Sequence, residues 1–206
     1  MQLARLNNLL SHSINKPFII FGPSGSGKST IIKHVISKYP SKFELLVSHT
    51  TRTMRDGEID GKSYYFINKT EFESMIEGNE FIEHVSYSNN LYGTSFSDIE
   101  RIINNNRVPI LDIDIGGVKS MISHLGEKSS NKLFIDVPDI KELEKRLRER
   151  GTETEESIKK RLDTAVREIA IINEEGLFDR RVLNIDHEEC IRNVEEHVKE
   201  LYYKDK

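Results

Sequence analysis

One glycine-rich stretch, residues 22–29, constrains the fold more than any other part of the chain. It reads GPSGSGKS and matches the pattern G-x-x-x-x-G-K-[ST] of a phosphate-binding P-loop. An apolar run at residues 17–21 precedes it, and residues 30–39 after it carry apolar side chains on one helical face. Strand, glycine loop and helix are the three parts that this motif needs, so the stretch predicts an α/β fold built around it.

The predicted loop implies a particular chemistry. Glycines let backbone N–H groups approach phosphate oxygens where a Cβ would intrude, and the helix N-terminus adds partial positive charge. We expect Lys28 to reach the β- and γ-phosphates of ATP and the Ser29 hydroxyl to bind Mg²⁺. The alternative is a glycine turn that only resembles the motif, and the flanking strand and helix argue against it. The expected ATP-binding residues are Gly22, Pro23, Ser24, Gly25, Ser26, Gly27, Lys28, Ser29 and Thr30.

Size, charge and cysteine usage narrow the class of protein. The 206 residues suffice for one α/β domain with small insertions or for two small domains. A net charge of −4 gives no general attraction to nucleic acid or to an anionic membrane. No apolar run approaches the roughly 18 residues of a membrane helix. The single cysteine, Cys190, excludes an intrachain disulfide and fits a reducing compartment, so we expect a cytoplasmic protein.

Strands alternate with helices along the chain, which predicts a parallel sheet with right-handed crossovers. Beyond the P-loop segment, we expect strands at residues 44–48, 63–68, 80–87, 108–114, 132–137 and 181–185. We expect helices in residues 1–16 and at 70–78, 94–103, 116–125, 139–150, 154–174 and 188–203. Thr70 and Glu73 have the spacing of a capping box, and we expect Thr154 to cap the helix that begins with it. Residues 49–61 are polar and charged, and we interpret them as a loop.

Two further groups of side chains suggest binding sites. One indicates a second anion site, and the other indicates the edge of the sheet at which a ligand binds. Arg52 and Arg55 lie three residues apart in the predicted loop, and arginine grips phosphate with two N–H groups at once. Surface arginines without a ligand are the alternative. The apolar strand at residues 108–114 ends in Asp112 and Asp114, and the carboxyl ends of such strands border ligand sites in α/β sheets.

Taken together, these stretches of the chain resemble the guanylate kinases. The matching stretches run in family order from about residue 17 to the C-terminus: GPSGSGKST, VSHTTRTMRDGEIDGKSYYF, NEFIEH, YGTS, ILDID and KRLRERGTETEESIKKRL. The resemblance implies a P-loop NTPase-type parallel sheet flanked by helices, formed by residues 1–47 and 97–206. It also implies a small α+β GMP-binding insertion at residues 48–96 and a helical lid at about residues 139–161. Met54 and Gly116 depart from the family pattern, where proline and glutamine are common.

The resemblance also implies the site residues. It places the GMP phosphate on Arg52, Arg55, Tyr64 and Tyr92. It places the guanine near Ser48, Glu83, Thr94 and Asp114. The residues with catalytic, phosphate-facing roles are Lys28, Arg52, Arg146, Arg150 and Arg161. The chemistry of Glu83 agrees with its role, because a carboxylate only accepts hydrogen bonds and guanine offers N1–H and its 2-amino group side by side.

The implied reaction is phosphoryl transfer from MgATP to GMP, giving ADP and GDP, by a monomer or homodimer with no nucleic-acid or membrane partner. Asp112 or Asp114 orders a Mg²⁺-bound water, and the sequence leaves open which one. Two alternatives remain: an inactive module of the same family that binds a phosphorylated peptide, and a P-loop kinase for another nucleotide or a sugar phosphate. The intact residues 27–29 argue against the first, and Glu83 with the arginine loop argues against the second.

Overall fold

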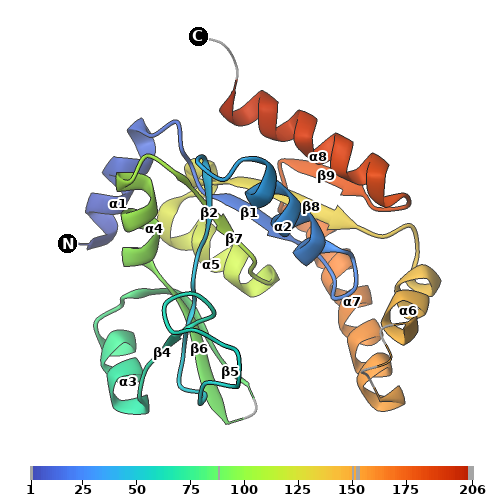
Figure 1. Ribbon diagram of the computed structural model, residues 1–206, viewed down its shortest axis with the longest axis horizontal. Helices are drawn as coiled ribbons and strands as arrows, with labels where there is room; N and C mark the ends of the chain where they lie inside the picture. Colours follow the sequence, from blue (N-terminus) through green and yellow to red (C-terminus); the bar gives the residue numbers. More distant parts are fainter. Residues whose placement is uncertain (1, 88, 150, 152–153, 204–206) are drawn as a thin grey trace. The chain divides into compact units, whose positions relative to one another are not determined.

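The computed structural model describes residues 2–87, 89–149, 151 and 154–203 (Figure 1). Its contacts divide the chain into two compact units. The arginine-loop unit comprises Met1–Pro17, Ser41–Leu111 and Gly116–Ser130, and the P-loop unit comprises the remaining segments, Phe18–Pro40, Asp112–Ile115 and Asn131–Lys206. This division reflects which segments contact one another in space. The predicted boundaries of the insertion at residues 48 and 96 stay a prediction.

The P-loop unit contains a parallel three-strand arrangement. Its strands are β1 (Phe18–Phe21), β8 (Asn131–Asp136) and β9 (Arg180–Leu183), with β8 paired to both others. Every residue of β1 is buried, as expected for a parallel strand covered on both faces. Helix α2 (Lys28–Lys38) contacts β1, and α8 (His187–Tyr202) contacts β9 and α2. The P-loop therefore joins a fully buried strand to a helix that packs on it, as its sequence predicts.

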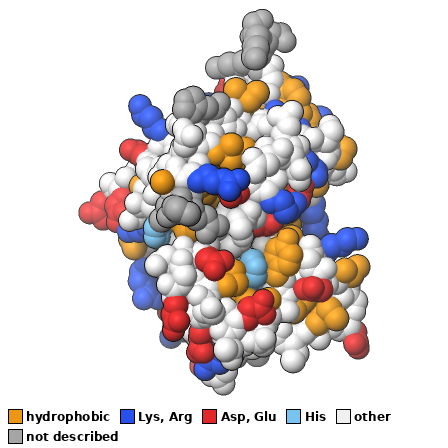
Figure 2. All heavy atoms as spheres, turned by 90° about the vertical axis from the view of Figure 1, so that its left-hand side faces the viewer, with side chains coloured by type: hydrophobic (Ala, Val, Ile, Leu, Met, Phe, Trp, Pro, Cys, Tyr) orange, Lys and Arg blue, Asp and Glu red, His pale blue; other side chains and the backbone are white. Residues whose placement is uncertain are grey.

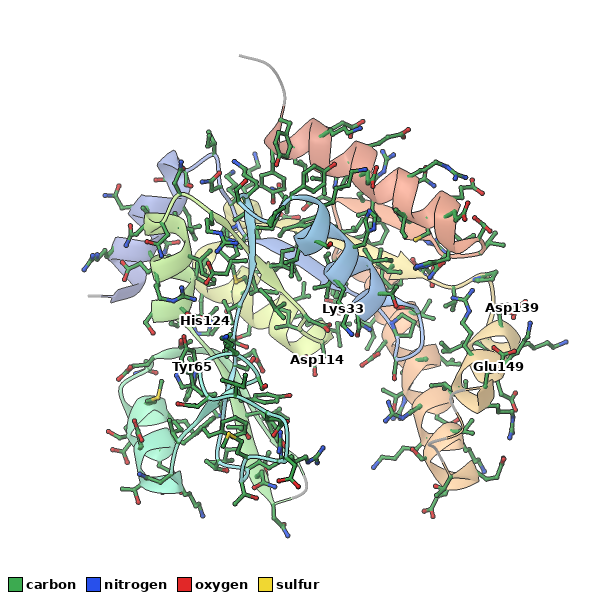
Figure 3. All side chains as sticks on the ribbon, in the orientation of Figure 1. Lys33, Tyr65, Asp114, His124, Asp139 and Glu149 are labelled. Carbon is green, nitrogen blue, oxygen red and sulfur yellow. The ribbon has the colours of Figure 1, made fainter. Side chains whose placement is uncertain are left out.

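The predicted lid corresponds to two helices of the P-loop unit that lie side by side, α6 (Ile140–Glu149) and α7 (Glu155–Glu175). In Figure 3, Asp139 and Glu149 mark the two ends of α6. Leu143, Leu147 and Ile158 belong to one apolar cluster that holds the pair together. The predicted N-cap of α7 is confirmed, since the Thr154 side chain accepts a hydrogen bond from the backbone of Ser157.

The arginine-loop unit contains two sets of strands. In the first, β2 (Phe43–Leu45) and β7 (Val108–Leu111) pair in parallel. The second is a four-stranded sheet in the order β4 (Tyr65–Phe66), β3 (His49–Thr50), β6 (Asn90–Ser95) and β5 (Phe81–Tyr87). The remaining elements of this unit are α1 (Gln2–His12), α3 (Lys69–Glu77), α4 (Phe96–Asn104), α5 (Ile115–Leu125) and the 3₁₀ turn η1 (Glu127–Ser129).

The α/β fold is confirmed, with parallel strands flanked by helices, but three local predictions are wrong. The loop expected at residues 49–61 begins with strand β3, and residues 90–95 form the unpredicted strand β6. Antiparallel pairing between β3 and β6 stabilises both strands. A two-residue strand such as β3 has no sequence pattern from which this pairing could be predicted. The capping box is also wrong, because α3 begins at Lys69 and the Asn68 side chain caps it by accepting from Glu71. None of the described helices is long and apolar enough to cross a membrane.

Candidate functional site

The P-loop is shaped by backbone geometry that only glycine permits. Gly22 has φ of 145°, and a Cβ added there would lie 2.1 Å from the carbonyl oxygen of Ile135 on β8. Gly27, with φ of 95°, is the N-cap residue of α2. The Lys28 ammonium donates to the carbonyls of Gly22 at 2.7 Å and Pro23 at 3.0 Å. The loop therefore holds a cation at the N-terminal end of a helix, an arrangement suited to phosphate.

A residue that the sequence reasoning missed supports this loop from behind. Asn184, directly after β9, is 4% exposed, and its amide Nδ2 donates to the carbonyl of Ser26 at 2.7 Å. A Cβ on Gly27 would lie 2.5 Å from the same Nδ2 atom. The two bonded residues are 158 positions apart. Because a lone asparagine after a strand matches no motif, the sequence offers no signal for this contact.

Two of the predicted lid arginines contact the same region. Arg161 on α7 donates through Nη1 to the Ser24 hydroxyl at 2.6 Å. Arg146 on α6 donates to the carbonyl of Asn184 and to Glu142, both at 2.8 Å. The third predicted lid arginine, Arg150, lies outside the described residues. The structure thus brings two of the predicted phosphate-facing arginines to the P-loop and to the asparagine that supports it.

Two carboxylates of the P-loop unit come shortly after β7 along the chain, as predicted. Asp112 and Asp114 are both exposed, and Asp114 lies at the start of α5 (Figure 3). The protein around Asp112 displaces enough water to raise the pKa of its carboxyl, against the opposing charge of Lys28. Glu168 on α7, which the sequence reasoning missed, also has a raised pKa, caused first by burial and then by the charge of Asp114. Ser29 and Thr30 are exposed at the first turn of α2.

The predicted phosphate site in the arginine-loop unit is centred on Arg52. The guanidinium of this residue makes two parallel hydrogen bonds to Glu58, at 2.9 and 2.7 Å. It lies 5.4 Å from the ring of Tyr64 and 5.6 Å from the ring of Phe66. The Tyr64 ring is in turn 5.9 Å from that of Tyr92. The structure therefore brings Arg52, Tyr64 and Tyr92 together, as predicted.

Two other members of this loop differ in their surroundings. Arg55 is exposed, and its backbone N–H donates to Glu58 at 2.7 Å. Glu58 receives hydrogen bonds from Arg52 and from this N–H, and they lower the pKa of its carboxyl to about 2. The sequence reasoning missed Glu58, because an acid six residues after an arginine has no regular spacing that would pair them.

Two of the predicted base-binding residues of this unit, Glu83 and Thr94, lie on neighbouring strands, and Ser48 directly precedes β3. The Thr94 hydroxyl on β6 donates to Glu83 on β5 at 2.6 Å, and the Ser48 hydroxyl lies 3.4 Å from the Thr94 hydroxyl. A register shift between Phe81 and Glu83 places a bulge in β5 beside this chain of contacts. The fourth predicted member, Asp114, belongs to the P-loop unit.

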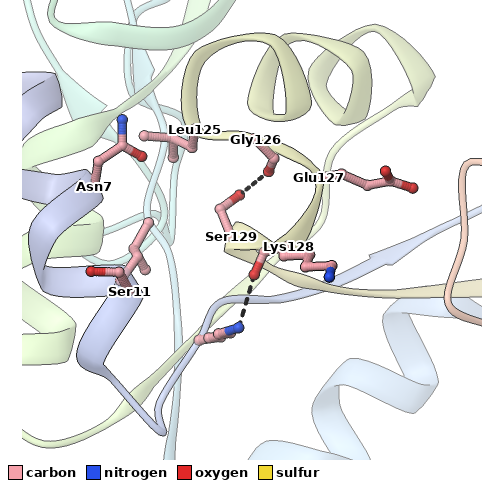
Figure 4. A pocket seen from close by; sticks show the side chains of 9 residues that line it. Asn7, Ser11, Leu125, Gly126, Glu127, Lys128 and Ser129 are labelled. Atoms are coloured by element: carbon pink, nitrogen blue, oxygen red, sulfur yellow. Dashed lines mark hydrogen bonds between the residues drawn. The ribbon is translucent and has the colours of Figure 1, made fainter.

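A pocket elsewhere in the arginine-loop unit contains none of the predicted residues (Figure 4). Its volume is about 560 Å³, and α1, the end of α5 and η1 line it. Lys16 donates to the carbonyl of Lys128 at 2.9 Å, and Ser129 donates to that of Gly126 at 2.6 Å. These polar groups of the lining therefore form hydrogen bonds with one another.

On the face shown in Figure 2, acidic and basic side chains are interspersed.

Comparisons with known proteins identify relatives over most of the chain. The family model described as guanylate kinase matches residues 14–201. The guanylate kinase of the pig, Sus scrofa, is 41% identical over 82% of this chain and 84% of its own length. That of Schizosaccharomyces pombe is 41% identical over 87% of this chain and 88% of its own.

Two further matches have a narrower meaning. Guanylate kinase 1 of Oryza sativa is 44% identical over 87% of this chain, and the chain spans 46% of the length of that rice protein. The crystal structure of guanylate kinase from Anaplasma phagocytophilum superposes with a TM-score of 0.64, covering 93% of this chain and 89% of the other. The sequences of this last pair are 24% identical, so the likeness supports the fold alone.

Proposed function

The chain belongs to the guanylate kinase family, and from this premise we propose that it transfers the γ-phosphoryl group of ATP to GMP. The observation that carries the proposal is the presence, in one chain, of an intact P-loop and of a second cationic site around Arg52. A phosphoryl transfer between two nucleotides needs one anion site for the donor and one for the acceptor. A module that only binds a phosphorylated peptide has no use for Lys28.

At the donor site, the backbone of residues 22–29 and Lys28 bind the ATP phosphates. The transition state spreads negative charge over the γ-phosphoryl oxygens, so catalysis consists mainly of positioning and cationic stabilisation. Arg146 and Arg161 supply positive charge from the lid, which is supported by their contacts with Asn184 and Ser24. Arg150 joins them in the proposal by its place in the family pattern. Opening of the Lys28 contacts to the loop carbonyls lets the ammonium reach phosphate oxygens.

The donor set beside the P-loop fits Mg²⁺, which prefers oxygen ligands and keeps several waters. The Ser29 hydroxyl would hold the ion directly, and Asp112 or Asp114 would order one of its waters. The described residues contain no group of three or more His, Cys, Asp or Glu that could hold a metal. Phosphate oxygens of a bound nucleotide would supply further ligands of the kind that Mg²⁺ prefers. When bound, the ion neutralises charge on the β- and γ-phosphates.

At the acceptor site, Arg52, Arg55, Tyr64 and Tyr92 hold the phosphate of GMP. The attacking phosphate oxygen is already anionic at neutral pH, so the transfer needs no general base. Glu83 accepts hydrogen bonds from N1–H and the 2-amino group of guanine. Its contact with Thr94, which Ser48 approaches in turn, supports this role, because it fixes the carboxylate on its strand. Asp114 is proposed as a further contact to the base.

The experiment that tests the proposal measures ADP production by the purified chain, in a coupled assay, with GMP, AMP, dTMP and UMP as acceptors. We expect turnover with GMP and MgATP and little with the other three. Equal turnover with another nucleotide would favour a P-loop kinase of different specificity. Tight binding of GMP with no turnover would favour the inactive module. We further infer a cytoplasmic location, which the lone buried Cys190 supports.

A further inference from the structure

The segment that carries the acceptor arginines folds back on itself through a tight turn. The backbone N–H of Glu58 donates to the carbonyl of Arg55 at 3.1 Å, and Gly57 within the turn has φ of 82°. The turn returns the Glu58 carboxylate to the chain it has just left. There the carboxylate accepts from the Arg55 N–H at 2.7 Å and from both terminal nitrogens of Arg52.

The hydrogen bonds of Arg52 show which side of its guanidinium is used. Nη1 donates to Glu58 at 2.9 Å and to the carbonyl of Thr53 at 2.8 Å, and Nη2 donates to Glu58 at 2.7 Å. A guanidinium has five N–H groups, and these contacts engage three of them. The other two, the Nε–H and the second Nη2–H, lie parallel on the adjacent edge. That edge has the shape that binds two oxygens of one phosphate.

The surroundings of Arg52 fix the direction of this second edge. The Arg52 side chain is 11% exposed and packs near the rings of Tyr64 and Phe66. The Tyr92 hydroxyl, beside the guanidinium, also raises the pKa of Arg52 after the larger contribution of Glu58. Two predicted phosphate ligands, Tyr64 and Tyr92, therefore border the arginine while Glu58 holds its far end.

We propose that Glu58 is a positioning residue for the acceptor phosphate, because it grips the terminal edge of Arg52 and so directs the Nε/Nη2 edge to GMP. This inference rests on the proposed function, in which Arg52 binds that phosphate. A carboxylate that competed with the phosphate for the same N–H groups would act in the opposite direction. Its removal would then strengthen GMP binding, whereas loss of a positioning residue weakens it.

The test compares Glu58→Gln with the wild-type chain by steady-state kinetics and by calorimetric titration of GMP without ATP. The amide keeps the shape but turns an N–H toward donors. We expect KM and Kd for GMP to rise about ten- to a hundredfold, as for loss of a hydrogen-bonded charge, with KM for ATP unchanged. Glu58→Asp, which keeps the charge, should recover part of the affinity. Unchanged or tighter GMP binding in Glu58→Gln would overturn the proposal.

Two matched controls separate positioning from folding and from the proposed function. Glu73→Gln makes the same chemical change at an exposed residue of α3, paired only with Lys69 among the described contacts, and should bind GMP normally. Thermal unfolding of all variants shows whether they fold. In an Arg52→Ala background, Glu58→Gln should add no further loss, and an additional loss would refute action through Arg52. If Arg52→Ala itself leaves GMP affinity unchanged, the assigned acceptor site is wrong.

Discussion

The two units of this protein arrange positive charge by different means. In the P-loop unit the backbone conformation places the charge. Gly22 and Gly27 have φ values that residues with a side chain rarely adopt, and Lys28 lies at the start of α2. In the arginine-loop unit side-chain contacts place the charge, because Glu58 holds Arg52 and two aromatic rings border it. A main-chain site is sensitive to any added Cβ, whereas a side-chain site is sensitive to the loss of one charged partner.

The supports of the two sites also differ in distance along the chain. Asn184 reaches the P-loop from 158 positions away, while Glu58 reaches Arg52 from six. The arginine loop is therefore organised by its own turn, and the P-loop depends on the packing of the whole unit. We expect variants to separate these two kinds of dependence, and the following tests run from the largest expected effect to the smallest.

The largest effect is expected for Lys28→Ala. Removal of the ammonium takes away charge stabilisation at the transferred phosphoryl group, so kcat should fall by about a thousandfold or more. GMP should still bind with near wild-type affinity in calorimetry, because the side chains proposed to hold its phosphate belong to the other unit. A variant that keeps most of its kcat would show that the P-loop is not the donor site.

The next effect concerns the choice of base at Glu83. Adenine presents a lone pair at N1 and has no 2-amino group, so AMP leaves the carboxylate unpaired. We expect kcat/KM for GMP to exceed that for AMP by at least about a thousandfold, with IMP between them. Glu83→Gln should lower the ratio of kcat/KM for GMP to that for AMP at least about tenfold, since an amide can turn a donor toward N1 of adenine. An unchanged ratio would move base recognition to Ser48, Thr94 or Asp114.

A pair of glycine substitutions tests main-chain dependence directly. A Cβ at Gly22 would meet the Ile135 carbonyl oxygen at 2.1 Å, whereas one at Gly57 meets nothing within 4 Å, although both residues have positive φ. Gly22→Ala should lower the free energy of unfolding by about 3 kcal/mol or more. Gly57→Ala should cost only about 1 kcal/mol, the strain of its turn. Equal losses in urea unfolding would contradict the comparison.

The smallest effect is a pH dependence of the P-loop unit. His197 on α8 is buried against Phe18, and burial lowers the pKa of its imidazole, with Arg180 adding to the shift and Glu200 and Asp179 opposing it. The folded state therefore binds a proton less readily than the unfolded state. Stability is full above the unfolded pKa, about 6.5, and declines as pH falls through the lowered folded value.

Unfolding at pH 5 and pH 7.5 measures this dependence. His197→Phe removes one titrating group and should make the decline between the two pH values shallower. Exposed His187, at the start of the same helix, supplies the control, and its replacement by Phe should leave the decline as it is. A wild-type curve that is flat in this range would show that burial of His197 has no effect on its proton affinity.

Much of the fold, including the strand, loop and helix that carry the proposed donor site, was predictable because local patterns encode it. The P-loop spacing, the apolar β1 and the Thr154 cap act over a few residues, and each is confirmed. The strands β3 and β6 were missed because His49–Thr50 becomes a strand only by pairing with β4 and β6, which come later in the chain. The grouping of Arg52, Tyr64 and Tyr92 came from a family resemblance, since no spacing rule links these positions.

By itself, the sequence determined where phosphate-binding chemistry can occur, because the glycine pattern and the lysine after it dictate the conformation and charge of their own segment. The tertiary structure decided how that chemistry is held. Asn184 bonds to the P-loop only after β9 has paired with β8, and Glu58 meets Arg52 only after the turn at Gly57 reverses the chain. Hydrogen bonds between distant side chains depend on distance in space, and a linear pattern contains that distance only when both partners lie on the same regular element.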